Sequence, residues 1–397
     1  MRVAAWPAPA AIMRAHPSGI LPVPSTPRSQ QHATRAAFFL PGFAISAWAP
    51  IVPFAKARAG LDEAMLGMVL LCLGAGSLLA MPMAGALAAR QGSRRVMAVA
   101  MLLICATLPA LVLAPDALTL GAVLFVFGAA MGAMDCTMNI QAVVVERESG
   151  RALMSGFHAF YSIGCFVGAA AMTGLLSVGM SPALACLAAV VTMLLLVAAA
   201  VRHWRSERVD ADAPAFAWPR GIVLLVGAVC FVMFLAEGAM LDWGAVFLDQ
   251  SKGMDPAHAG VGYVAFALAM TVARLTGDRV VQAIGPMRAV VAGAVLAFTG
   301  FAVIVLAPTA MASLAGFVLV GIGCANIVPV MFSLAGRQTV MPESLAIPAV
   351  TTLGYAGVLV GPALLGFLAQ GTSLVFAFWC LGIAVLSVTV TTRWLRR

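Results

Sequence analysis

Long apolar runs fill the chain from about residue 35 onward, and short polar stretches separate them. An apolar helix needs about 20 residues to cross the hydrocarbon core of a bilayer, and the runs are of this length. The pattern therefore predicts an all-α membrane protein with twelve transmembrane helices. We expect the spans to begin near residues 35, 64, 96, 117, 153, 181, 221, 259, 287, 311, 343 and 372.

The composition agrees with a polytopic membrane protein. Hydrophobic residues make up 62% of the 397 residues and charged residues only 10%, with a mean hydropathy of +1.03. Soluble domains carry about 25% charged residues. The chain is too apolar for that class.

The basic residues lie mostly on one side of the predicted bundle. With the N-terminus inside, only Lys56, Arg58 and Lys252 of the 23 basic residues fall on the outer side, which leaves 20 at or near the cytoplasmic face. Short cytoplasmic loops retain Lys and Arg, so we expect both termini in the cytoplasm. The net charge of +8 then reflects topology and contact with the lipid bilayer, and no nucleic-acid partner is expected.

An internal repeat with a constant offset runs along nearly the whole chain. GLDEAMLG from Gly60 matches GMDPAHAG from Gly253, and LAP at 113–115 matches LAP at 306–308. The matched pairs also include Gly92 with Gly285, Arg95 with Arg288, Gly128 with Gly321, and GCFVG (164–168) with GVLVG (357–361).

The repeat predicts two six-helix bundles related by a pseudo-twofold axis along the membrane normal. We expect a disordered N-terminal extension (1–34), a first bundle (35–202), a cytoplasmic linker (203–220) and a second bundle (221–397). Two such halves enclose a cleft, and rocking them about it exposes the cleft to each side in turn. The glycine-rich GCFVG and GVLVG segments are expected to be seams where helices pack closely.

The loop after the second predicted span carries a recognisable motif. It reads GALAARQGSRR and contains Gly85, Arg90, Gly92, Arg94 and Arg95. The chain resembles the major facilitator superfamily, in which this loop motif recurs. Ala89 stands where the family usually has Asp, so the charged contact of that Asp with neighbouring helices is missing.

A degenerate second copy of the motif, ARLTGDRVVQAIGPMR, supplies Gly277, Asp278 and Arg279. Within the superfamily, the chain is similar to a bacterial branch near the fucose-permease-like proteins, through MDCTMNIQAVVVE, SGFHAFYSIG and AEGAMLDW. This resemblance implies the twelve-helix major facilitator fold and a place in the bacterial inner membrane.

Two carboxylates fall deep inside predicted spans. A charged side chain near the bilayer centre costs about 2.5 to 3.5 kcal/mol on insertion scales, so it needs a partner or a wet cavity. Asp135 in span four and Glu237 in span seven are expected to face the cleft from opposite halves and to couple transport to protons. Two structural alternatives remain open: Asp135 accepts hydrogen bonds from Asn139 or Thr137, or Glu237 pairs with Arg274.

Other polar and aromatic side chains in the spans are candidates for binding a solute. Asp242 is expected toward the outer mouth of the cleft, and the ring of Trp243 offers a flat face for stacking. A role in bridging or packing helices stays open for most of the candidates. The full set of binding candidates is Asn139, Asp242, Trp243, Asn326, Trp48, Tyr161, Tyr355 and His158.

These features predict a secondary active transporter that takes up a small polar solute together with protons by alternating access, and that works as a monomer. Span five lacks the proline of superfamily antiporters, which favours uptake; proton-driven efflux of a drug or metabolite is the alternative. No GxxxxGK[ST] loop or catalytic motif is present, so we expect no cofactor, no metal and no catalytic residue. A transporter-like receptor or membrane enzyme is the alternative from another class.

Overall fold

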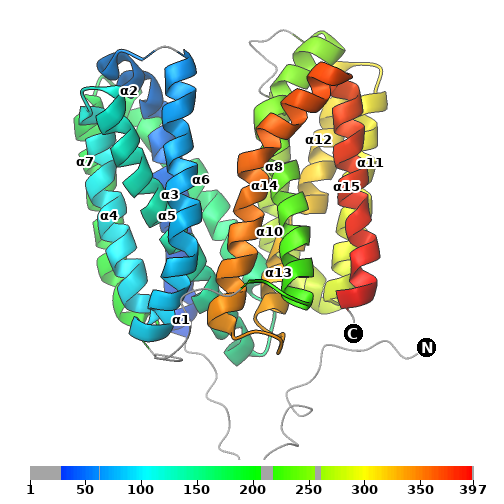
Figure 1. Cartoon of the computed structure of the whole chain (residues 1–397), viewed down its shortest axis with the longest axis horizontal. Helices are drawn as coiled ribbons and strands as arrows, with labels where there is room; N and C mark the ends of the chain where they lie inside the picture. The colour runs from blue at the N-terminus through cyan, green and yellow to red at the C-terminus, as the bar shows by residue number, and fades with distance from the viewer. Residues whose placement is uncertain (1–27, 62, 207–217, 255–260, 396–397) are drawn as a thin grey trace, which may run out of the picture.

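The computed structural model describes residues 28–61, 63–206, 218–254 and 261–395, and every regular element in these ranges is a helix. The helices form two halves that stand side by side (Figure 1). The first half comprises α1 (Arg28–Trp48), η3 (Ala49–Ile51), α2 (Val52–Ala59), α3 (Glu63–Gln91), α4 (Ser93–Leu113), α5 (Ala117–Ser149), α6 (Met154–Ser177), α7 (Pro182–Ala200) and η4 (Val201–His203). The second half comprises α8 (Ile222–Lys252), α10 (Val261–Ile284), α11 (Pro286–Leu306), α12 (Ala310–Cys324), α13 (Ile327–Ala335), α14 (Glu343–Gly371) and α15 (Leu374–Leu395).

The helices supply the twelve expected spans. Within the described ranges, eleven helical segments are long and apolar enough to cross a membrane. The remaining span is α10, which carries Arg274, Asp278 and Arg279 and is therefore less apolar. The chain is thus an all-helical, multi-pass membrane protein.

The first span differs from its predicted limits. Its helix α1 begins at Arg28, ahead of the start expected near 35, so residues 28–34 are helical. The rest of the predicted N-terminal extension, residues 1–27, lies outside the described residues. The span is interrupted after Trp48 by the short turn η3 before α2 continues, in the region of Pro50 and Pro53.

The tenth span is broken, which the sequence pattern did not predict. Helix α12 ends at Cys324 and α13 begins at Ile327, with a turn at Ala325 and Asn326 between them. Pro329 lies four residues after Ala325. A proline lacks the N–H that would bond to the carbonyl four residues earlier, and its ring crowds that carbonyl, so Pro329 accounts for the break.

The two halves pack their helices in the same way. Helix α1 packs on α6, α3 on α5, and α4 on α5 and α7. The equivalent pairs of the second half, α8 with α14, α10 with α12, and α11 with α12 and α15, are also in contact. Between the halves, α3 packs on α14 and α6 on α10, which are again equivalent pairs. The repeat in the sequence therefore corresponds to a repeat in packing.

The repeat extends to the backbone conformation of the loops. Gly60 and Gly253, which are equivalent positions of the repeat, both end a helix with φ of 66°. Gly92 and Gly285 both precede a helix with φ of 86°. Only glycine adopts positive φ at little cost, so these four positions require it.

Glycines also form the seam between α1 and α6, as the GCFVG segment predicts. A methyl group on Gly164 or Gly168 would overlap the backbone of Phe39 or Phe43 on α1. In the second half, Gly357 of α14 lies equally close to the backbone of Phe231 on α8. These positions hold the helix pairs at backbone contact.

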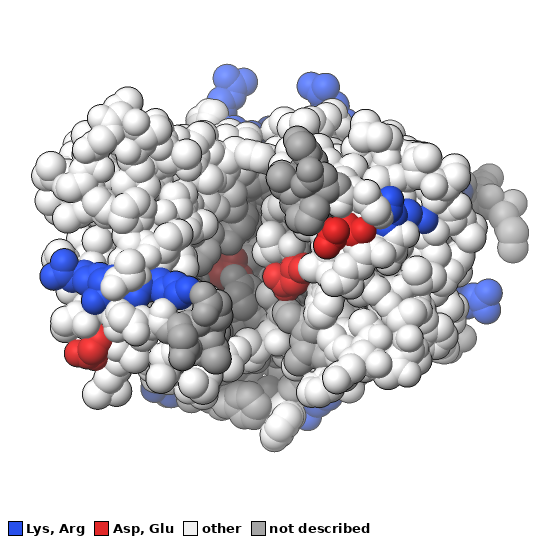
Figure 2. Space-filling view, turned by 90° about the horizontal axis from the view of Figure 1, so that it is seen from above, with Lys and Arg blue, Asp and Glu red and all other residues white. Residues whose placement is uncertain are grey.

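The halves meet closely at one face and separate at the other. We call the face where α1 begins and α15 ends the terminal face, and the opposite one the open face (Figure 1). At the terminal face, Arg147 of the first half forms an ion pair of 2.6 Å with Glu343 of the second. Figure 2 shows the open face hollowed between the halves, with acidic atoms in and beside the hollow.

Candidate functional site

The two predicted acids lie at mid-depth on central helices of opposite halves. The midpoint of α5 is residue 133, so Asp135 lies two residues, or about 3 Å, from the centre of its helix. Glu237 is at the midpoint of α8, residue 237, closer to the centre than its predicted span placed it. Asp135 is 9% exposed and the Glu237 side chain 20%, so neither points freely into lipid or bulk water.

Glu237 forms an ion pair with Arg274 of α10, the structural pairing that the sequence left open. The Nη2 atom of Arg274 lies 3.4 Å from Oε1 of Glu237. Arg274 is near the middle of α10, which runs well beyond it to Ile284, and not near the inner end of its span as the predicted limits implied. The pair therefore lies at the depth of the two acids.

Arg274 also joins the two halves. Its Nη1 atom donates to the hydroxyl of Ser162 on α6 of the first half, at 3.2 Å. Its Nε atom donates to the carbonyl oxygen of Ala325, also at 3.2 Å. That carbonyl is the one that Pro329 leaves without a helical partner. The broken tenth span thus supplies an acceptor that holds Arg274 beside Glu237.

Asp135 has a different environment. Its carboxylate interacts with the side chain of Tyr355, on α14 of the other half. The predicted hydrogen bonds from Asn139 and Thr137 to this carboxylate are absent among the described residues. Asn139 Nδ2 donates instead to the backbone carbonyl of Asp135 at 2.9 Å, and Thr137 donates to the carbonyl of Ala133.

Tyr161 and Asp242 are the other predicted residues that lie with the acids. Tyr161 of α6 is close enough to Asp135 and Tyr355 to interact electrostatically with both. Asp242 is exposed, on the part of α8 that runs from Glu237 toward the open face. Tyr263 of α10, which the sequence did not single out, lies in range of Glu237 and Asp242.

Four further candidates are packed among helices, and no described contact joins them to the acids. Trp48 is buried at the end of α1. Trp243 lies against Gly366 of α14, and its buried Nε1 atom has no hydrogen-bond partner in the described ranges. His158 lies between Phe38 and Phe332, with ring centroids 5.1 and 5.8 Å away. Asn326 occupies the break in the tenth span, and its buried Oδ1 has no partner among the described residues.

The loop motif of the first half makes apolar and backbone contacts. Gly85 lies against Pro348 and the carbonyl of Ser344 on α14, and a side chain there would overlap both. Arg94 donates to the carbonyls of Trp204 and Arg202, each at 2.8 Å, and so fastens the end of the first bundle. Arg90 and Arg95 are exposed, and Gly92 packs on Ser206.

The second copy of the motif makes the charged contact that the first lacks. The Asp278 carboxylate accepts hydrogen bonds from the backbone N–H groups of Ser155 and Gly156, both at 3.0 Å. These groups are at the N-terminus of α6, where the helix dipole favours a negative charge. Gly277 allows close contact with Ser155, and Arg279 is exposed.

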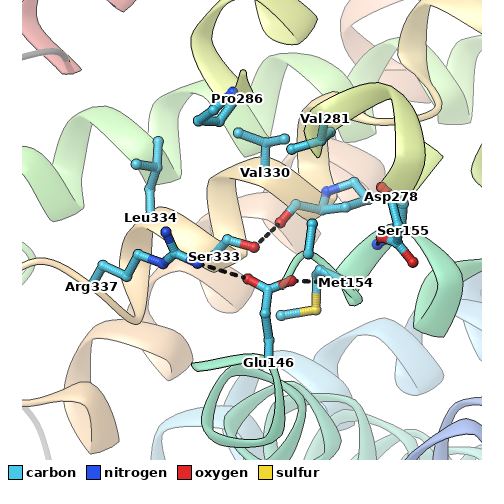
Figure 3. Close-up of a pocket in the computed structure, with 12 residues that line it drawn as sticks. Glu146, Met154, Ser155, Asp278, Val281, Pro286, Val330, Ser333, Leu334 and Arg337 are labelled. Atoms are coloured by element: carbon cyan, nitrogen blue, oxygen red, sulfur yellow. Dashed lines mark hydrogen bonds and ion pairs between the residues drawn. The ribbon is translucent and has the colours of Figure 1, made fainter. Parts of the chain in front are cut away.

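A buried acid outside the predicted set closes the same region. Glu146 is 2% exposed, accepts hydrogen bonds from the N–H groups of Leu153 and Met154 at 2.9 Å, and pairs with Arg337 of the second half at 3.7 Å (Figure 3). The pocket beside it has a volume of about 20 Å³, which is enough for a single water molecule. This pocket at the terminal face is therefore too small to admit a solute.

The fold, with two repeated helical halves, is that of a membrane transporter. The model of the Major Facilitator Superfamily matches residues 36–345, and the chain belongs to this family of transporters, which are not enzymes. An uncharacterised MFS-type transporter of Yersinia pestis is 50% identical over 92% of this chain and 95% of its own length. An uncharacterised transporter of Sinorhizobium fredii is 33% identical over 89% and 95%. Among solved structures, the fucose:proton symporter FucP of E. coli aligns with a TM-score of 0.74 at 15% identity, over 92% of this chain and 98% of its own.

Proposed function

We propose that the protein takes up a small polar solute together with protons by alternating access. The observation that carries this proposal is the pair of acids at mid-depth, Asp135 from the first half and Glu237 from the second, between halves that separate at one face. Lipid would not tolerate these charges, and a solute pathway gives them a role. The likeness to FucP is one of fold, so the proposal rests on the residues of this chain.

The distribution of basic residues supports the direction. The sequence places 20 of the 23 Lys and Arg residues at or near the terminal side; Arg274 lies at mid-depth instead, and the excess that remains supports a cytoplasmic terminal side by the positive-inside rule. The hollow then faces the outside, where a bacterium meets the solutes that it takes up. The relatives are bacterial proteins, which supports the bacterial inner membrane as the location.

Glu237 is the better of the two acids for the proton. Protonation of Glu237 removes the charge that Arg274 pairs with, and Arg274 also holds Ser162 of the other half. A proton on Glu237 therefore changes a contact between the halves, which is what coupling requires: the ligand must favour one conformation over the other.

Exposure of the site to the cytoplasm requires the terminal face to open. Contacts between the halves would then have to break, among them Asp278 with the N-terminus of α6, Arg147 with Glu343, Glu146 with Arg337, and Gln282 with the carbonyl of Ala152. The hollow at the open face would close in the same motion.

Transport by purified protein in liposomes with a pH-sensitive dye inside tests the proposal. The panel comprises sugars, sugar acids, amino acids and organic cations. We expect one class of solute to carry protons inward, and Glu237→Gln to abolish accumulation driven by a pH gradient while exchange of solute for solute persists. Accumulation by Glu237→Gln and Asp135→Asn at the level of the parent would overturn proton coupling through these acids. Proton movement opposite to the solute would identify efflux instead.

A further inference from the structure

Asp135 is a buried carboxylate that forms no ion pair within the described part of the chain. Among the described residues, no basic side chain forms an ion pair with it, whereas Glu237 has Arg274. Its neighbour Tyr355 offers a hydroxyl group, which does not neutralise a charge. A buried carboxylate is stable only with a cation or a proton beside it. A positively charged ligand would supply the charge that no described side chain provides.

All three tyrosines of the chain lie in the same region as the acids. Tyr161 is in electrostatic range of Asp135, Tyr355 and Tyr263. They come from α6, α10 and α14, which belong to both halves, and all three side chains are partly exposed. The faces of aromatic rings attract cations, and rings beside a carboxylate are the arrangement that binds ammonium groups.

An unpartnered acceptor lies one helical turn from Asp135. Asn139 is 1% exposed, and its Nδ2 atom donates to the backbone carbonyl of Asp135. Its Oδ1 atom is buried and has no partner among the described residues. Such an atom is costly to leave unbonded, and a ligand that donates hydrogen bonds would satisfy it. An ammonium group has donors to offer, and a carboxylate has none.

The accessible charge in the hollow is negative. Asp242 is exposed on α8, and the charged atoms visible within the hollow in Figure 2 are acidic. Arg274, the cation at this depth, is 6% exposed and is held by Glu237, Ser162 and the carbonyl of Ala325. A surface of one sign concentrates ligands of the opposite sign and repels its own. The hollow therefore favours cations over anions.

We infer that the solute carries a protonated amine, which binds against the Asp135 carboxylate among Tyr161, Tyr263 and Tyr355. This inference rests on the proposed transport function and gives the two acids separate roles. Asp135 receives the ammonium group of the solute, and Glu237 receives the driving proton.

Ligand binding by the full-length protein in detergent, measured as a shift in its thermal unfolding temperature, tests the inference. The probes are protonated amines, each matched to a neutral and an anionic compound of similar shape: glucosamine with glucose and gluconate, and choline with 3,3-dimethylbutanol and dimethylbutyrate. We expect an amine to bind and its matched compounds not to. Asp135→Asn removes a charged hydrogen-bond partner of the amine, so it should bind amines about 10- to 100-fold more weakly than the parent.

Two further variants separate recognition from folding and from the aromatic contact. Asp116→Asn removes the same charge from the exposed start of the same helix and keeps a residue that caps helices well, so amine binding should be unchanged. Tyr355→Phe keeps the ring and should bind amines nearly as the parent does, whereas Tyr355→Leu should bind them roughly 30-fold more weakly, the value of a desolvated cation–π contact.

The outcomes distinguish this inference from the proposed function. Amine binding that persists in Glu237→Gln but fails in Asp135→Asn supports the inference. If the liposomes then show no proton movement, the amine site stands and only proton coupling is wrong. Three results would overturn the inference and leave proton-coupled transport standing. These are preferred binding of a neutral or anionic compound over its matched amine, amine binding that survives Asp135→Asn, and the absence of any effect of the amines.

Discussion

The contact of Asp278 with α6 is expected to hold the terminal face closed, and Asp278→Asn tests this. The aspartate accepts two charge-assisted hydrogen bonds at 3.0 Å, each contributing about 1.5 to 3 kcal/mol. Asparagine keeps one acceptor oxygen but loses the charge that the helix N-terminus favours, itself about 0.3 to 1 kcal/mol. A net loss of about 2 kcal/mol shifts the equilibrium roughly 30-fold toward the state with the terminal face open.

Spin labels at two positions on the open face report the shift. Leu118 and Met311 are equivalent positions of the repeat, lie at the start of α5 and α12, and are 85% and 71% exposed. In a cysteine-free background that retains transport, labels at these sites should show a larger population of short distances in Asp278→Asn than in the parent. A cysteine in place of Ser333, which lines the terminal-face pocket, should be alkylated faster in the same variant.

The neighbouring exposed arginine provides the control. Arg279→Gln changes a charge one residue away without touching α6, so distances and alkylation should match the parent. If Asp278→Asn behaves like Arg279→Gln in both measurements, the contact does not hold the halves together, and the reasoning about the helix N-terminus is refuted.

Two other predictions concern stability. Gly164→Ala places a methyl group into the backbone of Phe39, so it should destabilise the protein by about 1 to 3 kcal/mol and lower the thermal unfolding temperature. Gly174→Ala on the same helix meets open space and should raise the unfolding temperature slightly. Equal effects of the two substitutions would contradict the close contact of Gly164. Arg274→Gln leaves Glu237 without its cation and should destabilise the protein by about 1 to 3 kcal/mol, less than for a fully buried pair because the Glu237 side chain is partly exposed. Adding Glu237→Gln should restore part of that stability but not proton coupling. A double variant no more stable than Arg274→Gln would show that the pair is not coupled.

The architecture was readable from the sequence because it depends on local chemistry and on repetition. The length of each apolar run fixes a span, since lipid leaves a backbone no partner outside its own helix. The constant offset of the repeat placed Gly60 opposite Gly253 and Gly92 opposite Gly285, and each pair has the same φ. The break in the tenth span also had a sequence signal, Pro329, which was overlooked.

The sequence also found the two acids, because a carboxylate within an apolar run is conspicuous wherever it points. It could not determine their partners. Tyr355 and Asp135 are far apart along the chain and lie in different halves, and the pairing of Arg274 with Glu237 and Ser162 depends on the rotation of three helices about their axes. Hydrophobic pattern constrains that rotation weakly in a membrane, where every face of a helix is apolar. Composition and repetition therefore determined the spans, the halves and the depth of the acids, and only the packing of the helices decided that Glu237 pairs with a basic side chain while Asp135 has none among the described residues.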